Sequence, residues 1–180
     1  MRVAVCDYGA GNVRSVLSAL ARLGVDAALT SDPGTVEAAP VALLPGVGSA
    51  RSAMAELERT GVAAALRERR GRTVGICLGL QLALEWSDED GGVSGLGLLS
   101  GRAVRLADGR VPRIGWAPVE PGGEVYWFAH SYVADTAAAT AVSEGLVAEA
   151  RSGDFVGCQF HPERSGPAGL DYLERCLSLA

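Results

Sequence analysis

The stretch Thr73–Gln81, which reads TVGICLGLQ, decides the fold of this chain. Its first four residues are typical of a short buried strand, and an apolar helical pattern begins at Leu78. The pattern G-x-C-x-G between them is a cysteine form of the nucleophile elbow, a tight strand-to-helix turn that exposes a reactive side chain at the carboxyl end of a sheet. Free N–H groups at the start of the helix favour a thiolate at Cys77. A buried structural cysteine is the alternative interpretation.

A second segment, Gln159–Glu163 (QFHPE), supplies a base for that nucleophile. His161 follows an expected strand, so it reaches the same carboxyl edge of the sheet as Cys77. Glu163 lies two residues further on, where a carboxylate can hold one imidazole nitrogen and fix the tautomer. A surface turn is the alternative for this segment alone. Together the two segments predict a catalytic triad of Cys77, His161 and Glu163.

Strands and helices alternate through the first half of the chain. We expect strands at residues 2–6, 27–29, 41–44 and 73–76, and helices at 13–23 (capped by Asn12 and ended by Gly24), 52–69 (with a break at Gly61) and 78–86. This order predicts an α/β fold with three layers, in which helices cover both faces of a largely parallel central sheet.

The second half of the chain changes to short strands joined by turns. We expect strands at residues 102–106, 125–129, 139–142, 146–150 and 155–160, hairpin turns at Asp108-Gly109 and Gly153-Asp154, and a last helix at 169–179. These elements add antiparallel hairpins to the parallel sheet. The chain shows no interdomain linker, internal repeat or low-complexity tract, so we expect residues 1–180 to form a single domain.

The charged residues exclude several classes of function. The 180 residues carry a net charge of −5, and all 16 basic residues are arginine. Without lysine, neither a Schiff base nor the lysine of a nucleotide-binding P-loop is available. No basic stripe with interleaved aromatic residues predicts nucleic-acid binding. The stretch Arg67–Arg72 is interpreted as the solvated end of a helix, which the helix dipole favours.

Histidines and cysteines are too few and too scattered for a metal site. The two histidines, His130 and His161, cannot form a three-histidine zinc site, and the four cysteines form no C-x-x-C pair. We therefore predict no metal and no cofactor, and we expect every cysteine except Cys77 to be a small buried apolar residue. No apolar run reaches the ~18 residues of a membrane span, and the N-terminus enters a strand directly. We predict a cytoplasmic protein that does not bind a membrane.

The two catalytic segments resemble the signatures of class I (triad-type) glutamine amidotransferases. Three further segments narrow the resemblance to the glutaminase subunits of imidazole glycerol phosphate synthases: Asp7–Ser15 (DYGAGNVRS), Pro45–Ser49 (PGVGS) and His130–Tyr132 (HSY). The five motifs follow one another in the family's order over nearly the whole chain. The resemblance implies that Cys77 attacks the side-chain amide of glutamine, with His161 as base and then acid, and Glu163 as its orienting carboxylate.

The same resemblance implies the residues that bind glutamine. Backbone N–H groups of Leu78 and of the Pro45–Gly48 segment, near Val47 and Gly48, would form the oxyanion hole. The substrate itself would contact Gln81, Glu89 near its α-amino group, and Ser131 and Tyr132 near its α-carboxylate, with His130 in the same motif. A solvated carboxylate is the alternative for Glu89, and a structural or interface histidine is the alternative for His130.

In the resembling family, a partner uses the ammonia. The glutaminase forms a heterodimer with a cyclase that is a (β/α)8 barrel, and the barrel makes imidazole glycerol phosphate and aminoimidazole carboxamide ribotide for histidine synthesis. This chain departs from the family pattern at several positions, some of them near the partner in the family: Ala50, Arg113, Ala117, Val133 and Arg164. These departures change residues expected near the docking surface and leave the triad intact.

Three alternatives to this function stay open. One is the glutaminase subunit of another ammonia-channelling complex such as pyridoxal phosphate synthase, although PGVGS and the DYGAGN start argue against it. Another is a nucleotide-binding module built on Gly9 and Gly11, but Arg14 stands where the third glycine of G-x-G-x-x-G belongs. The third is a non-catalytic scaffold subunit, against which the complete triad argues.

Overall fold

A parallel sheet forms the centre of the protein, for which a computed structural model describes residues 2–9, 13–107 and 111–178. Within these residues the main sheet has seven strands, in the order β11 (Ala139–Ser143), β12 (Leu146–Ser152), β13 (Phe155–Cys158), β4 (Arg72–Ile76), β3 (Val41–Leu44), β1 (Arg2–Cys6) and β2 (Asp26–Thr30). The five strands from β13 to β2 are parallel, and β12 and β11 continue the sheet antiparallel. The predicted largely parallel sheet is confirmed.

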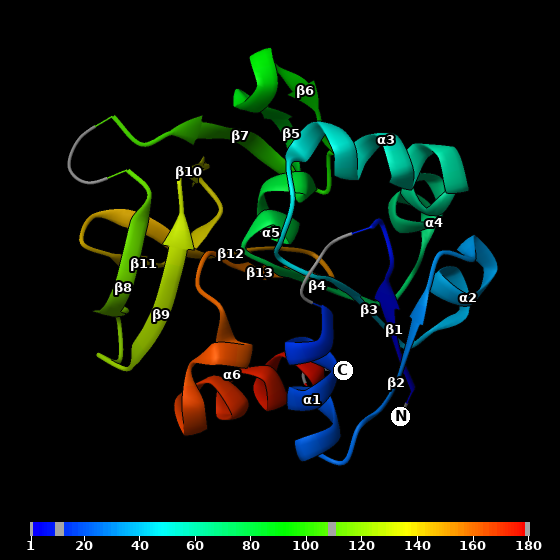
Figure 1. Cartoon of the computed structure of the whole chain (residues 1–180), viewed down its shortest axis with the longest axis horizontal. Coiled ribbons are helices and arrows are strands. Elements are labelled where there is room, and N and C mark those ends of the chain that lie inside the picture. The colour runs from blue at the N-terminus through cyan, green and yellow to red at the C-terminus, as the bar shows by residue number, and fades with distance from the viewer. Residues whose placement is uncertain (1, 10–12, 108–110, 179–180) are drawn as a thin grey trace.

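Helices cover both faces of this sheet (Figure 1). Side chains alternate along a strand, so Val3 and Val5 of β1 enter one apolar cluster while Ala4 and Cys6 enter another. The first cluster is covered by α1 (Val13–Arg22) and α6 (Gly166–Ser178), and the second by α2 (Pro33–Ala38), α3 (Ala50–Thr60), α4 (Val62–Glu68) and α5 (Leu78–Ala83). The predicted three-layer α/β fold is confirmed.

Two small sheets lie beside the main sheet in the described chain. One joins β10 (Tyr132–Asp135), β7 (Leu99–Arg105), β5 (Leu84–Ser87) and β6 (Val93–Ser94), and the other is an antiparallel ribbon of β8 (Arg113–Pro118) and β9 (Val125–His130). Gly153-Asp154 joins β12 to β13 as the predicted two-residue hairpin. The predicted turn at Asp108-Gly109 and the predicted cap Asn12 lie outside the described residues.

Several predicted boundaries were wrong, and after the elbow the reason is that pairing with distant strands overrides the local pattern. The helix predicted to reach Trp86 ends at Ala83, and Leu84–Ser87 instead pairs as β5 with β7 and β6. The last strand ends at Cys158, short of Phe160. Elements α2, β6, β8 and β10 were not predicted. The predicted break at Gly61 is confirmed, because its φ of 80° separates α3 from α4.

Arg69 corrects the interpretation of the arginine-rich stretch as solvated. Its guanidinium is buried and donates to the carbonyl oxygens of Val36 (3.1 Å), Gly71 (2.7 Å), Arg72 (2.6 Å) and also Ala39. Those carbonyls lie at the end of α2 and the start of β4, so the side chain joins these two elements. Its charge is placed among backbone dipoles rather than in water.

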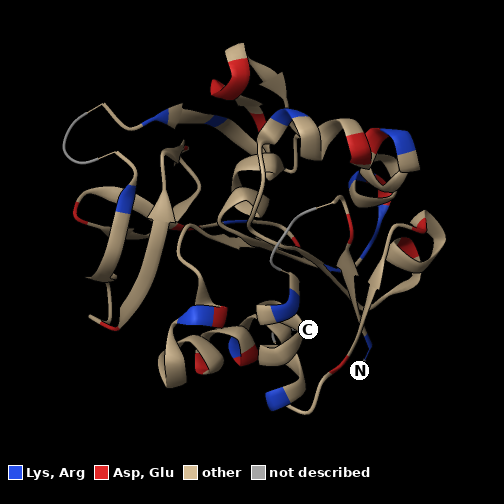
Figure 2. Cartoon of the chain, in the orientation of Figure 1, with Lys and Arg blue, Asp and Glu red and all other residues tan. Residues whose placement is uncertain are grey.

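Charged residues elsewhere lie mainly on the outer elements. Figure 2 shows acidic and basic residues interspersed over α3, α4 and α6, with few on the central strands. Such mixing agrees with the modest net charge of −5. No described helix has both the length and the apolar character needed to cross a membrane.

Candidate active site

Cys77 occupies the tight turn between β4 and α5. Its backbone has φ 47° and ψ −100°, a conformation that L-residues rarely adopt, and its N–H donates to the Cys158 carbonyl at 2.7 Å. The turn closes because two glycines meet: a β-carbon on Gly75 would lie 2.7 Å from the carbonyl carbon of Gly79. The strained backbone and the close packing of strand on helix are those expected of a nucleophile elbow.

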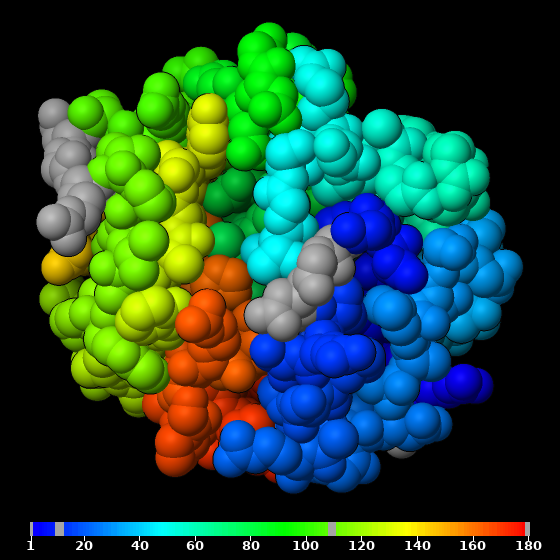
Figure 3. Space-filling view, in the orientation of Figure 1, coloured from blue at the N-terminus to red at the C-terminus, as the bar shows by residue number. Residues whose placement is uncertain are grey.

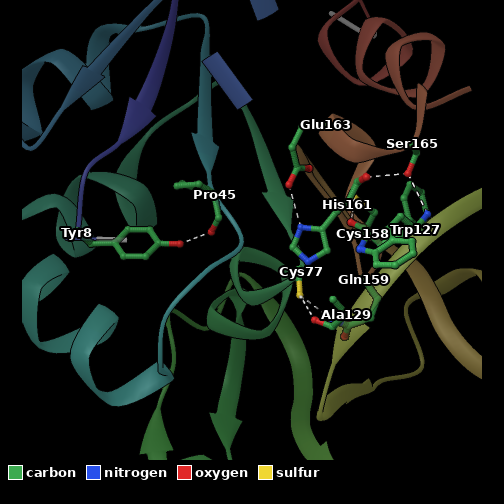
Figure 4. A network of polar contacts seen from close by, with 11 residues as sticks. Tyr8, Pro45, Cys77, Trp127, Ala129, Cys158, Gln159, His161, Glu163 and Ser165 are labelled. Carbon is green, nitrogen blue, oxygen red and sulfur yellow. Dashed lines mark hydrogen bonds and ion pairs between the residues drawn. The ribbon is translucent and has the colours of Figure 1, made fainter. Parts of the chain in front are cut away.

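His161 lies between Cys77 and Glu163, with its ring facing the sulfur (Figure 4). Nδ1 of His161 is 2.9 Å from Oε1 of Glu163, and both side chains are buried. Burial opposes the imidazolium, but the hydrogen bonds and charges of Cys77 and Glu163 outweigh it and raise the pKa of His161 to about 10. The arrangement therefore favours a protonated imidazole at His161 that Glu163 holds in place.

The backbone around His161 is fixed from both sides. Its N–H donates to the Trp127 carbonyl at 2.8 Å, and its carbonyl accepts from the Ser165 hydroxyl at 2.7 Å. The oxygen of that hydroxyl also accepts from the Trp127 N–H at 2.9 Å. These three bonds join β9 to the short 3-10 helix η2 (Pro162–Arg164), so the imidazole is held on a rigid support (Figure 4).

A cavity of about 320 Å³ opens beside the cysteine. Figure 3 shows the hollow between the cyan segment that leads into α3 and the yellow strands β9 and β10, with green atoms at its floor. It is lined by every predicted site residue except Glu163, which lies behind His161: Val47, Gly48, Cys77, Leu78, Gln81, Glu89, His130, Ser131, Tyr132 and His161. The fold thus brings residues of five separate segments to one place.

Gly46, Val47 and Gly48, in the segment Pro45–Gly48, form one wall of the cavity. A β-carbon on Gly46 would lie 2.6 Å from the Ile76 carbonyl oxygen and 2.9 Å from the Cys77 β-carbon, so only glycine allows this approach. The hydroxyl of Tyr8 donates to the Pro45 carbonyl and anchors the segment from the other side (Figure 4). Tyr8 belongs to the DYGAGN motif, and this contact is the role that the structure gives it.

The opposite wall centres on the backbone carbonyl of Tyr132. It accepts from Gln81 Nε2 at 2.8 Å and from His130 Nδ1 at 2.9 Å, which sets the His130 tautomer. Burial lowers the pKa of His130 to about 4, and the positive charges of Arg113 and His161 act in the same direction. His130 is therefore neutral, in contrast to His161.

Glu89 reaches the cavity from the 3-10 helix η1 (Glu89–Gly91). Its Oε2 accepts from the Ala50 N–H at 2.7 Å, at the start of α3. Arg51 donates to the carbonyls of Asp90 and Gly92, so the loop that carries Glu89 is tied to the same helix end. A carboxylate at the N-terminus of a helix is favoured by the helix dipole. The site therefore holds one negative charge across the cavity from the triad.

Sequence reasoning missed some residues that line the cavity or touch the sulfur. Pro112, Ala129 and Arg164 line the cavity, and the buried Gln159 donates from Nε2 to Cys77 Sγ at 3.4 Å. A signal for Gln159 was available, because an amide in an otherwise apolar buried strand end needs a polar partner. The identity of that partner depends on packing between β13 and the elbow.

The arrangement agrees with the comparisons with known proteins. The sequence profile of the family described as glutamine amidotransferase class-I matches residues 4–179. A solved glutamine amidotransferase superposes with a TM-score of 0.83 at 21% identity, covering 98% of this chain and 99% of that one, and PurLQS from Thermotoga maritima superposes with 0.71 at 19%. The chain belongs to the class I glutamine amidotransferases.

Curated relatives narrow this family further. The chain is 40% identical over 194 residues to the imidazole glycerol phosphate synthase subunit HisH of Methanothermobacter thermautotrophicus, covering 98% of both chains. It is 43% identical over 193 residues to the subunit of the same name from Moorella thermoacetica, covering 96% of this chain and 92% of that one. Within the class I glutamine amidotransferases, it is thus grouped with the HisH subunits of imidazole glycerol phosphate synthase.

Proposed function

We propose that this chain, as one glutamine amidotransferase domain over residues 1–180, is the glutaminase subunit of an imidazole glycerol phosphate synthase. It hydrolyses glutamine to glutamate and ammonia, and the ammonia passes to a cyclase partner that makes imidazole glycerol phosphate and aminoimidazole carboxamide ribotide for histidine synthesis. The observation that carries this proposal is the Cys77–His161–Glu163 arrangement at the elbow, with the 2.9 Å contact between His161 and Glu163. Its support in sequence is the roughly 40% identity to HisH subunits.

The proposed chemistry follows from the charges of the triad. The Cys77 thiolate attacks the carbonyl carbon of the glutamine side chain, and the tetrahedral oxyanion is stabilised by N–H groups of Leu78 and Val47. His161, as imidazolium, gives its proton to the departing nitrogen as the C–N bond breaks, leaving a glutamyl thioester and ammonia. A water molecule, deprotonated by the now neutral His161, then cleaves the thioester and releases glutamate.

The proposed substrate contacts use the charges around the cavity. Glu89 would hold the α-amino group of glutamine, because it is the carboxylate that lines the cavity opposite the thiol. Ser131 and Tyr132 would receive the α-carboxylate side, Gly48 belongs to the segment that supplies the oxyanion N–H groups, and Gln81 and His130 complete the wall. The neutral state of His130 keeps a second positive charge away from the reacting thiolate.

The face of the β8–β9 ribbon is the proposed surface for the partner. Ile114, Trp116 and Val125 are 59%, 56% and 46% exposed, which is unusual for large apolar side chains that lie together. Trp116 contacts Trp127 edge-on at 5.6 Å, and Arg164 lies over the Trp127 ring. Arg164 also lines the cavity, so the apolar face leads directly to its mouth. A (β/α)8-barrel cyclase seated there would receive ammonia without release to water.

The cytoplasm stays the predicted location of this activity. All four cysteines lie in the described chain and are free thiols, which agrees with a reducing compartment. Neither a metal nor a cofactor enters the proposed reaction, because the thiolate, the imidazole and the oxyanion N–H groups supply each step.

The decisive test replaces the nucleophile. Cys77→Ala is expected to lower glutamine hydrolysis by at least about 10⁴-fold, measured as glutamate release by the complex with its cyclase. The melting temperature should change little, because the thiol is small. Cys176→Ala, a buried cysteine on α6, is the matched control and should keep its turnover. Full turnover by Cys77→Ala would refute the triad assignment.

A second experiment tests the partner. A purified barrel subunit of about 250 residues should co-elute with this chain as a heterodimer. We expect little hydrolysis by the isolated chain and much more when the cyclase and its ligand are bound. Full turnover by the chain alone would contradict this gating.

A further inference from the structure

Gln159 touches the reacting sulfur, although no role in the proposed reaction has been given to it. The side chain is fully buried at the end of β13, and its Nε2 donates to Cys77 Sγ at 3.4 Å. Its Oε1 accepts from Gln81 Nε2 at 3.3 Å, and its backbone N–H donates to the Ala148 carbonyl. Figure 4 shows Gln159 close to Cys77 and Ala129. Both ends of the amide are therefore engaged.

The direction of this amide is set by a neighbouring backbone carbonyl. The oxygen and nitrogen of a glutamine side chain are exchangeable by a flip, so the orientation must come from the partners. The Tyr132 carbonyl can only accept, and it is 2.8 Å from Gln81 Nε2. The nitrogen of Gln81 therefore faces both the Tyr132 carbonyl and the Gln159 side chain. Gln159 accepts from that nitrogen with its oxygen, so its own nitrogen points to the Cys77 sulfur and donates to it.

A second neighbour of the sulfur, the Ala129 carbonyl, favours the protonated thiol rather than the thiolate. The Ala129 carbonyl lies 3.9 Å from Sγ and can accept from the protonated thiol. A carbonyl oxygen cannot donate to a thiolate, so this contact favours the neutral form, whereas an amide N–H favours the charged form. Gln159 and Ala129 thus act on the same atom with opposite sign.

We propose that Gln159 positions the Cys77 sulfur and stabilises its thiolate, and that the relay from the Tyr132 carbonyl through Gln81 fixes the direction of the donor. The inference deepens the proposed glutaminase function and rests on it. It adds to the triad a neutral donor that depends on the wall of the cavity where glutamine would bind. A shift of the Tyr132 carbonyl would in this way change the hydrogen bond to the Cys77 sulfur, through the side chains of Gln81 and Gln159.

The test measures the reactivity of Cys77 directly. Iodoacetamide alkylation of the full chain is followed against pH, and the modified Cys77 peptide is quantified by mass spectrometry. The other cysteines do not compete, because burial raises the pKa of Cys6 to about 12, of Cys176 to about 11, and of Cys158 well above its usual value. The titratable and charged groups around the sulfur are His161, Glu163, His130, Tyr132, Tyr8, Glu89 and Arg164. All of them stay unchanged in the variants.

Gln159→Met removes the N–H donor to the Cys77 sulfur and keeps a side chain of similar length. The midpoint of Cys77 alkylation against pH should rise by roughly one pH unit, which is an about tenfold lower rate at any fixed pH well below the midpoint. Gln159→Glu should shift the midpoint at least as far, because a carboxylate cannot donate and adds negative charge. Cys158→Ala is the matched control: it also disturbs a fully buried side chain of the same segment, and its midpoint should not move.

A second variant tests the relay from the Tyr132 carbonyl through Gln81 without changing Gln159. Gln81→Met removes the anchor of the amide, so the midpoint should rise by less than in Gln159→Met, and the double variant should show less than the sum of the two shifts. An unchanged midpoint in folded Gln159→Met overturns the inference. Where Gln159→Met does not fold, an unchanged midpoint in Gln81→Met overturns it instead.

The two proposals fail in different ways. Alkylation needs no glutamine and no partner, so retained hydrolysis in Cys77→Ala would refute the function while the alkylation midpoint still measured the Gln159 contact. Loss of hydrolysis in Cys77→Ala together with an unmoved midpoint in Gln159→Met would keep the function and refute the role of Gln159.

Discussion

The β4–α5 elbow and the β8–β9 ribbon both line the same cavity but are built in opposite ways. In the elbow, Val74, Cys77 and every residue of α5 are buried, and backbone meets backbone at glycines. In the ribbon, buried and exposed side chains alternate, and two of the exposed ones are Ile114 and Trp116. The elbow is stabilised within the chain, whereas the ribbon leaves large apolar side chains exposed, as protein-binding surfaces do. Cys77 is thus fixed by packing, whereas the ribbon face is the surface proposed for the partner.

The largest expected effect comes from the elbow. A β-carbon on Gly79 would overlap the Leu44 carbonyl oxygen, and neither backbone can move without shifting the nucleophile. Gly79→Ala should lower the free energy of unfolding by about 3 kcal/mol or more, measured by urea denaturation. Gly34→Ala in α2 is the control, since its nearest neighbour is an ordinary 3.5 Å contact with Asp32. Equal effects at the two glycines would contradict the tight backbone packing of the elbow.

The ribbon should show the reverse behaviour. Trp116→Ala should change the free energy of unfolding by less than about 1 kcal/mol, since the side chain is exposed and loses little beyond its contact with Trp127. Affinity for the cyclase should fall about 30-fold, roughly 2 kcal/mol, as titration of the two purified subunits would measure. Leu29→Ala, an exposed apolar residue on β2, should leave affinity unchanged. A loss of stability in Trp116→Ala without a loss of affinity would show that the ribbon face is structural.

The smallest expected effect is on the titration midpoints of the two histidines. His161 packs against the elbow, and His130 lies in the ribbon, at the end of strand β9. His161 should titrate near pH 10, and His130 near pH 4. NMR of the ring protons should therefore show neither histidine titrating near 6.5, the value of an unperturbed histidine. A midpoint near 6.5 for His161 would remove the thiolate–imidazolium pair from the proposed mechanism.

The two histidine shifts act on stability with opposite signs. The raised pKa of His161 contributes stability that is complete below about pH 6.5 and is lost as pH rises toward about 10. The lowered pKa of His130 makes stability fall as pH drops from about 6.5 toward about 4. Urea denaturation across this range should show a weaker alkaline fall in Glu163→Gln and a weaker acid fall in His130→Asn.

The local sequence pattern was enough to predict the structural elements that depend on glycine or on a buried strand. The elbow at Cys77, the break at Gly61 and the turn at Gly153-Asp154 were all predictable, because each depends on the backbone freedom of glycine or on two-residue turn geometry. The end of α5 was not predictable. Leu84–Ser87 continues a helical sequence pattern, and only the presence of β7 beside it makes a strand more favourable.

The sequence by itself determined the chemistry of this protein: which thiol, imidazole and carboxylate are available, and that two strand ends bring them to one edge of the sheet. Only the tertiary structure decided how those groups are tuned. The contact of Gln159 with the sulfur, the neutral state of His130 and the burial of Arg69 each depend on atoms from distant segments. Hydrogen bonds and burial act over a few ångströms in space, and one-dimensional spacing does not encode those distances.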